Sequence, residues 1–111
     1  MTAEPDLLER VRHALTERNP REVPMFGGVS FMVDERMVAA CRRDQELLLR
    51  IDPTDSERLL REPGAHPVLM GAGRTMGAGW IAVRAAALEG DGLAAWLAHA
   101  LAFHDSGQRA G

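Results

Sequence analysis

The stretch Val29-Ser30-Phe31-Met32-Val33-Asp34-Glu35-Arg36-Met37-Val38-Ala39-Ala40-Cys41-Arg42 decides the fold, because its apolar side chains follow a period of two. The same period continues through residues 46–51, and the pair Gly27-Gly28 comes just before it. Asp34-Glu35 and Arg43-Asp44 are candidate tight turns between the apolar runs. Residues 29–51 are therefore predicted to form three antiparallel strands.

Pairing these strands through two-residue turns predicts which side chains share a face of the sheet. Val33 is placed opposite Arg36, and Arg42 opposite Gln45. The face predicted to be the core then carries Val29, Phe31, Val33, Val38, Ala40, Leu47, Leu49 and Ile51. The other face carries Ser30, Met32, Met37, Ala39, Cys41, Glu46, Leu48 and Arg50, and it is more apolar than a solvated surface requires.

Helical patterns flank this predicted sheet. Residues 6–18 place their leucines and Val11 on one face of an amphipathic helix, with a capping box at Asp6 and Glu9 and a stop at Asn19-Pro20. Asp52-Pro53 is typical of a helix start, and Pro63-Gly64 ends this short helix. A last amphipathic helix is predicted from near Asp91, and residues 105–111 are expected to fray.

Two further strands are predicted at residues 68–70 and 79–83, on either side of a glycine-rich loop. The fold class is therefore α+β, with the order α-β-β-β-α-β-β-α over a single domain of residues 1–111. We expect an antiparallel sheet with the helices packed on one face. Phe31, Val38 and Leu49 are expected to be buried against the first and last helices.

Composition excludes several classes of protein. The 111 residues suit one domain, and no apolar run approaches the roughly 20 residues of a membrane-spanning helix. A single cysteine cannot form an internal disulfide, and the acidic first residues do not resemble a signal peptide, so we expect a cytoplasmic protein that does not bind membranes. The net charge is −3 and the 13 basic residues are scattered arginines, so no direct nucleic-acid partner is expected.

Several blocks of sequence occur in an order that resembles a known family. They are Met25-Phe26-Gly27-Gly28 with the strand after it, Leu48-Leu49-Arg50-Ile51, Gly73-Arg74-Thr75-Met76, Gly79-Trp80, and Trp96-Leu97 with residues 100–103. Together they resemble the TfoX N-terminal domain family, the first domain of bacterial competence regulators of the TfoX/Sxy type. The resemblance implies the same order of elements and a regulatory or protein-interaction role without catalysis. Asp34-Glu35 stands where this family often has Asn-Gly.

The chemical candidates favour structural roles. The motif residues Met25, Phe26, Gly27, Gly28, Arg74, Met76, Gly79 and Trp80 are expected to support the fold. The glycine spacing from Gly71 to Gly79 resembles a phosphate loop, but a strand follows it instead of a helix. A small-ligand or anion site at this loop with Arg74 is therefore kept as the alternative function. No catalytic residue, cofactor or metal site is predicted, since Cys41 has no sequence-local histidine and His99 and His104 point apart on one helix.

The second face of the predicted sheet indicates a protein partner. Met32, Met37, Cys41 and Leu48 would leave an apolar surface uncovered if all the helices pack on the opposite face. Pairing of identical patches about a two-fold axis is the commonest way to bury such a surface. We therefore expect a homodimer or a complex with another protein.

The charge distribution predicts no binding to DNA at near-physiological salt. An electrophoretic mobility shift assay with duplex DNA tests this directly. Repeating the assay at low salt detects even weak phosphate contacts, because these strengthen as the salt concentration falls. Complexes that form at micromolar protein and persist at near-physiological salt would contradict the prediction.

Overall fold

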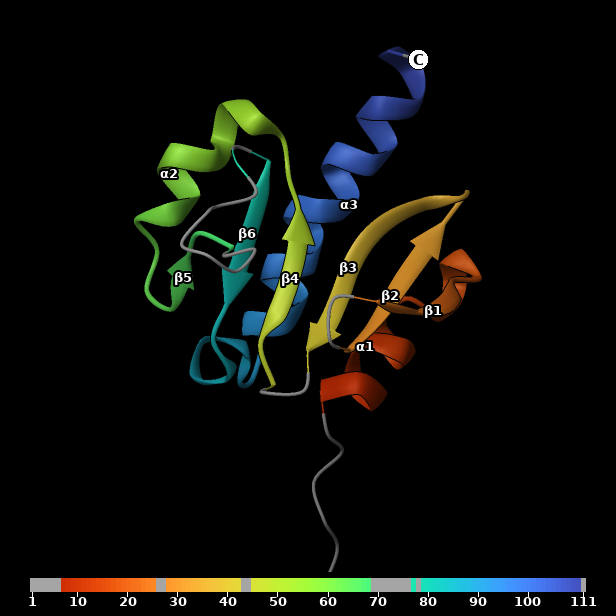
Figure 1. Ribbon diagram of the computed structural model, residues 1–111, viewed down its shortest axis with the longest axis horizontal. Coiled ribbons are helices and arrows are strands. Elements are labelled where there is room, and N and C mark those ends of the chain that lie inside the picture. The colour runs from red at the N-terminus through yellow and green to blue at the C-terminus, as the bar shows by residue number, and fades with distance from the viewer. Residues whose placement is uncertain (1–6, 26–27, 43–44, 69–76, 78, 111) are drawn as a thin grey trace, which may run out of the picture.

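The computed structural model describes residues 7–25, 28–42, 45–68, 77 and 79–110, and this part of the chain has an α+β fold. Within it, one antiparallel sheet has the strand order β1-β2-β3-β4-β6-β5 (Figure 1). The strands are β1 (Arg21–Met25), β2 (Gly28–Val33), β3 (Arg36–Arg42), β4 (Leu47–Arg50), β5 (Ala65–His66) and β6 (Trp80–Val83). The helices are α1 (Leu7–Ala14), α2 (Ser56–Leu60) and α3 (Gly92–Ala110), with the short 3₁₀ turns η1 (Thr16–Arg18), η2 (Pro53–Asp55) and η3 (Ala85–Leu88). The predicted fold class is confirmed, and β1 is an additional strand.

The main hydrophobic core lies between the sheet and the helices. Figure 1 shows α3 running behind β3 and β4. Phe31, Val38 and Leu49 are at most 1% exposed, and they share one buried cluster with Val11 of α1 and Leu97 of α3. Their predicted burial against the first and last helices is confirmed.

The predicted register between β2 and β3 is wrong along most of its length. Val33 pairs with Arg36 as predicted, but the register then shifts and Phe31 pairs with Ala39. A β-bulge leaves Val38 without a partner on β2 and places both Val38 and Ala39 in the helix-side core. The extra residue changes which side chains of β3 face the helices.

The connection between β3 and β4 is also longer than predicted. Gln45 has a φ of 66° and its amide donates to the Arg42 carbonyl over 3.0 Å, while the Arg42 amide donates to the Glu46 carbonyl over 3.0 Å. Arg42 therefore pairs with Glu46, not with Gln45. The predicted turn residues Arg43 and Asp44 lie outside the described residues.

These two shifts move three small side chains to the face opposite the predicted one. Cys41 pairs with Leu47 and, like Ala39, lies in the helix-side core. Ala40 pairs with Leu48 on the other side. That side, which we call the second face, carries a smaller buried cluster of Met37, Ala40, Leu48, Val68 and Ala82, with Met32 and Trp80 partly buried around it.

The sequence pattern did not predict β1, because this strand lacks apolar alternation. It forms one edge of the sheet, where the missing amide donor of Pro24 is tolerated. Arg12 of α1 donates two hydrogen bonds to Glu22, from Nε to Oε2 over 2.6 Å and from Nη2 to Oε1 over 2.9 Å. This contact joins α1 to β1, and it lowers the pKa of the Glu22 carboxyl.

A two-residue strand, β5 (Ala65–His66), lies just before the strand predicted at residues 68–70. Gly64 has a φ of 84°, and its carbonyl accepts the Arg84 amide over 2.9 Å, so pairing with β6 begins at Ala65. Val68 is buried but is not in a strand, and residues 69 and 70 lie outside the described part of the chain. The predicted cap at Asp52 is confirmed, since its carboxylate accepts the Thr54 amide over 2.9 Å.

The last helix continues beyond the point where fraying is expected. α3 extends to Ala110, and Asp105 is held by an ion pair with Arg18 at 2.7 Å. This contact ties the far part of α3 to the turn after α1. None of the described helices, α3 included, combines the length and the apolar character that spanning a bilayer requires.

Replacing Phe31 with alanine is expected to lower the free energy of unfolding by about 3 to 5 kcal/mol, because the side chain is fully buried and would leave a cavity. Urea denaturation followed by circular dichroism measures the change. Val29→Ala, on the same strand but only half-buried, serves as the control and is expected to cost less. Equal losses for the two variants would contradict the assigned role of Phe31.

Replacing Glu35 with glycine is expected to stabilise the protein by about 1 kcal/mol, because both turn residues adopt left-handed backbone, with φ of 53° at Asp34 and 67° at Glu35. Glu35→Ala is the matched control: it removes the same exposed ion pair with Arg21 but keeps the Cβ strain. Thermal unfolding compares the two variants. A glycine variant no more stable than the alanine variant would contradict the strain argument.

Candidate functional site

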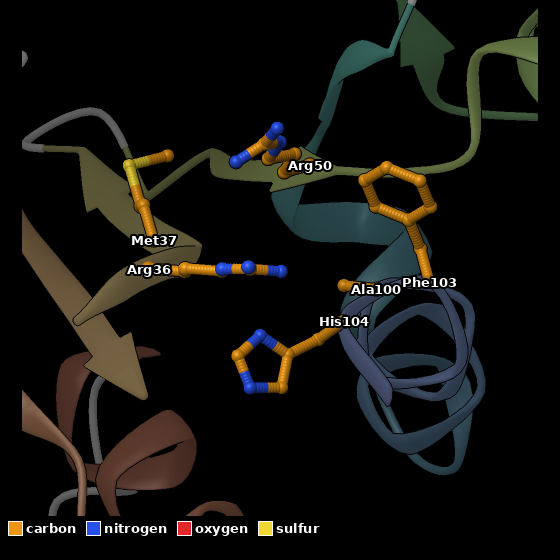
Figure 2. Close-up of a pocket in the computed structure, with 6 residues that line it drawn as sticks. All are labelled: Arg36, Met37, Arg50, Ala100, Phe103 and His104. Carbon is orange, nitrogen blue, oxygen red and sulfur yellow. The ribbon is translucent and has the colours of Figure 1, made fainter. Parts of the chain in front are cut away.

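A cleft of about 390 Å³ opens where the ends of β3 and β4 meet α3 (Figure 2). It is lined by Arg36, Met37, Arg50, Ala100, Phe103 and His104, and we call it the basic cleft. The lining combines two guanidinium groups with an aromatic ring, an imidazole and two apolar side chains. All six residues belong to elements of the folded core, so the packing of the sheet and α3 positions them.

The two arginines line the same cleft because β3 and β4 are antiparallel neighbours. Arg36 is the first residue of β3 and Arg50 is the last residue of β4. The start of one strand therefore lies beside the end of the other. Figure 2 shows Arg36 reaching from β3 toward α3, with Arg50 on the neighbouring side of the same opening.

The helical wall of the basic cleft comes from one face of α3. Ala100, Phe103 and His104 are spaced at i, i+3 and i+4, which places them on the same side of the helix. Ala100 is only 1% exposed, and its small side chain lets the helix approach the sheet closely. Phe103 is half-buried and faces the opening together with His104 (Figure 2).

Within the described residues, neither guanidinium of the basic cleft forms an ion pair with a carboxylate. The Arg50 guanidinium carbon lies 5.6 Å from the centroid of the Phe103 ring, within the range of a cation–π contact. Arg36 and Arg50 are both exposed at the mouth of the cleft. The opening therefore carries positive charge next to an aromatic surface.

His104 fixes the position of α3 against the sheet. Its side chain is 3% exposed, and its Nε2 lies 3.2 Å from Oδ2 of Asp34 in the turn between β2 and β3. The neighbouring Asp105 binds Arg18. These two contacts hold the turn of α3 that presents Phe103 to the cleft.

The six residues that line the basic cleft include no hydroxyl or thiol group. Among the described residues, no group of three or more histidine, cysteine, aspartate or glutamate side chains is arranged to hold a metal ion. Cys41 is 6% exposed and belongs to the helix-side core. Two guanidinium groups beside a ring suit recognition of an oxyanion.

The glycines of the predicted family motif have backbone roles. A Cβ at Gly28 would clash with the carbonyl oxygen of Cys41 on the neighbouring strand, so only glycine fits this close approach. Gly79 has a φ of 93°, and its carbonyl accepts the Ile51 amide over 2.8 Å. At both positions the backbone geometry favours glycine.

The remaining motif positions are described only in part. Trp80 begins β6 and is half-buried beside the second-face cluster. Met25 is the last residue of β1. Phe26, Gly27, Arg74 and Met76 lie outside the described residues, as does most of the loop from Gly71 to Gly79.

The structure brings together three of the four residues predicted at an interface. Met32, Met37 and Leu48 lie on the second face, whereas Cys41 lies in the helix-side core. Met37 is 8% exposed and Leu48 is 1% exposed, so both are buried within the chain itself. Met32 keeps partial exposure.

Sequence reasoning missed the basic cleft. Its lining residues are spread from position 36 to position 104, and Arg36 and Arg50 look like ordinary solvated ends of strands. The sequence did contain one indication of this cleft. Arg36 and Arg50 stand at the ends of neighbouring antiparallel strands, and the last helix carries an aromatic residue and a histidine. That signal needs the packing of α3 before it points to one location.

Comparison with known proteins gives one result. The model of the TfoX N-terminal domain family matches residues 14–104, a range that contains all six residues of the basic cleft. No curated protein and no solved structure matches the chain. The family match agrees with the resemblance found in the sequence blocks.

Proposed function

Because the chain belongs to the TfoX N-terminal domain family, we propose that it is a regulatory module that acts by binding another protein and not by catalysis. The partner that we propose is a second copy of the chain. Support comes from the family assignment and from the apolar second face of the sheet.

The main observation behind this proposal is the apolar second face of the sheet. None of the described helices provides a residue to the cluster on that face. The buried clusters separate cleanly: residues from α1, α2 and α3 all join the helix-side core, whereas the described members of the second-face cluster come from strands and from Val68. In Figure 1, α3 lies behind the sheet, on the side away from this face. Apolar residues at the rim of such a face favour contact with another molecule.

The proposed contact surface centres on Met32 and Trp80. Both are partly buried against the second-face cluster and keep exposed atoms, whereas Met37 and Leu48 beneath them are already covered. A two-fold axis near Met32 would bring identical residues of two copies together, which is the commonest arrangement of soluble homo-oligomers.

The alternative function remains a small-ligand or anion site at the loop from Gly71 to Gly79 with Arg74. Of this loop, the structure describes Gly77 and Gly79, which have φ of 89° and 93°. Binding of an anion that depends on Arg74, measured with an Arg74→Gln variant, would favour this alternative over self-association.

Light scattering across the micromolar range tests the proposed self-association. The wild-type chain is expected to have twice the chain mass, and Met32→Glu is expected to raise the dissociation constant on the order of 100-fold, because a charge would be buried without a partner. Met32→Leu keeps the apolar contact and is the matched control. Circular dichroism must show that the glutamate variant stays folded.

Two outcomes would count against this proposal. If the folded wild-type chain is a monomer over the whole concentration range, the proposal of self-association is wrong. A folded Met32→Glu variant that still dimerises would move the interface away from the second face.

A further inference from the structure

We propose that the basic cleft binds a small organic anion, namely a carboxylate or phosphate monoester that carries an aromatic or apolar group. The oxyanion would lie between the guanidinium groups of Arg36 and Arg50, and the apolar group would contact Phe103. Met32 and Trp80 do not line this site, but the two regions are neighbours, because Arg50 pairs with Trp80 across β4 and β6 and Met37 belongs to the second-face cluster.

The charge of the cleft favours an anion. Arg36 and Arg50 extend into one opening, and like charges held close together repel each other. A carboxylate or phosphate between the two guanidinium groups would offset this repulsion and accept hydrogen bonds from both of them. Arginine is better suited than lysine to this task, because its planar guanidinium binds oxyanions through two donors.

The nearby carboxylates do not provide this counter-charge. Four described carboxylates lie within two residues of Arg36, Arg50 or His104 in the sequence; three of them contact a basic side chain, and the fourth, Asp52, accepts hydrogen bonds from Thr54. The pairs are Asp34 with His104 at 3.2 Å, Glu35 with Arg21 at 2.8 Å and Asp105 with Arg18 at 2.7 Å. Asp34 is the acidic group that bears most closely on the site, through His104, so the two arginines leave a net positive charge there.

The size and the walls of the cleft favour an organic ligand over a bare inorganic ion. Its volume of about 390 Å³ is far above the roughly 30 Å³ that one water occupies, and it falls in the range of small-molecule sites. Phe103, Met37 and Ala100 supply apolar surface beside the charges. The Arg50 guanidinium carbon lies over the Phe103 ring, 5.6 Å from its centroid, so an apolar ligand group would contact the part of Phe103 that Arg50 leaves uncovered.

The test uses the full chain and four probes that separate charge from shape: benzyl phosphate, benzoate, inorganic phosphate and benzyl alcohol. Isothermal titration calorimetry is expected to show binding of benzyl phosphate and benzoate. Inorganic phosphate is expected to bind about tenfold more weakly than benzyl phosphate, because it lacks the apolar contact, and benzyl alcohol is expected not to bind. The comparison of benzoate with benzyl phosphate identifies which oxyanion the cleft prefers.

Matched variants locate the binding. Arg36→Gln and Arg50→Gln are each expected to weaken benzyl phosphate binding about tenfold or more, because each removes charge-assisted hydrogen bonds. Arg84→Gln removes an exposed arginine that does not line the cleft, and it is expected to leave binding unchanged. Phe103→Leu is expected to weaken benzyl phosphate binding while sparing inorganic phosphate.

Three outcomes would overturn the proposal: no binding of either aromatic anion, equal binding of inorganic and benzyl phosphate, or equal effects of the Arg36→Gln and Arg84→Gln variants. Thermal unfolding of each variant shows that it is folded. Light scattering of the Arg36→Gln variant is expected to match the wild type, because Arg36 is not part of the second-face cluster, so a failure of anion binding and a failure of self-association can be told apart.

Discussion

Packing of α1 and α3 against a single face of the sheet is the interaction on which the other features depend. Residues of both helices and of the central strands share one buried cluster, and burial of each large aliphatic side chain contributes roughly 1.5 to 3 kcal/mol. Exposed ion pairs such as Arg21 with Glu35 contribute far less. Because Leu97 and Ala100 hold α3 on the sheet, the next turn of α3 must carry Phe103 and His104 past the strand ends. The basic cleft is thus a consequence of core packing.

The elements of this fold and most of its core were predictable, because the signals for them are local. Phe31, Val38 and Leu49 were placed correctly, but Ala40 and Cys41 were not. Residues 39–41 are all small and apolar, so the pattern looks the same in either register. The bulge at Val38 and the left-handed residue Gln45 then decide the outcome, and neither leaves a clear mark in the sequence.

The candidate site was not predictable to the same degree, because it is assembled by tertiary structure. Arg36, Arg50 and Phe103 come from three elements, and each residue has an ordinary reason to be where it is. Only when the three residues line one cleft do the two guanidinium groups form a candidate anion-binding site. The second face differs, because the alternating pattern of the strands predicted that Met32 and Met37 lie on it. In the structure, the members of its cluster that keep partial exposure are Met32 and Trp80.

The two edges of the described sheet limit how copies of this chain can meet. Pro24 interrupts the hydrogen-bond donors of β1, and β5 offers only two residues before Pro67. Neither edge is a good template for recruiting a strand from another molecule. If copies of the chain pair as proposed, the contact would therefore use a face of the sheet, and a two-fold pairing closes on itself. The sheet, whose second face leaves only Met32 and Trp80 partly exposed among the residues of its cluster, is thus poorly suited to open-ended growth into fibres.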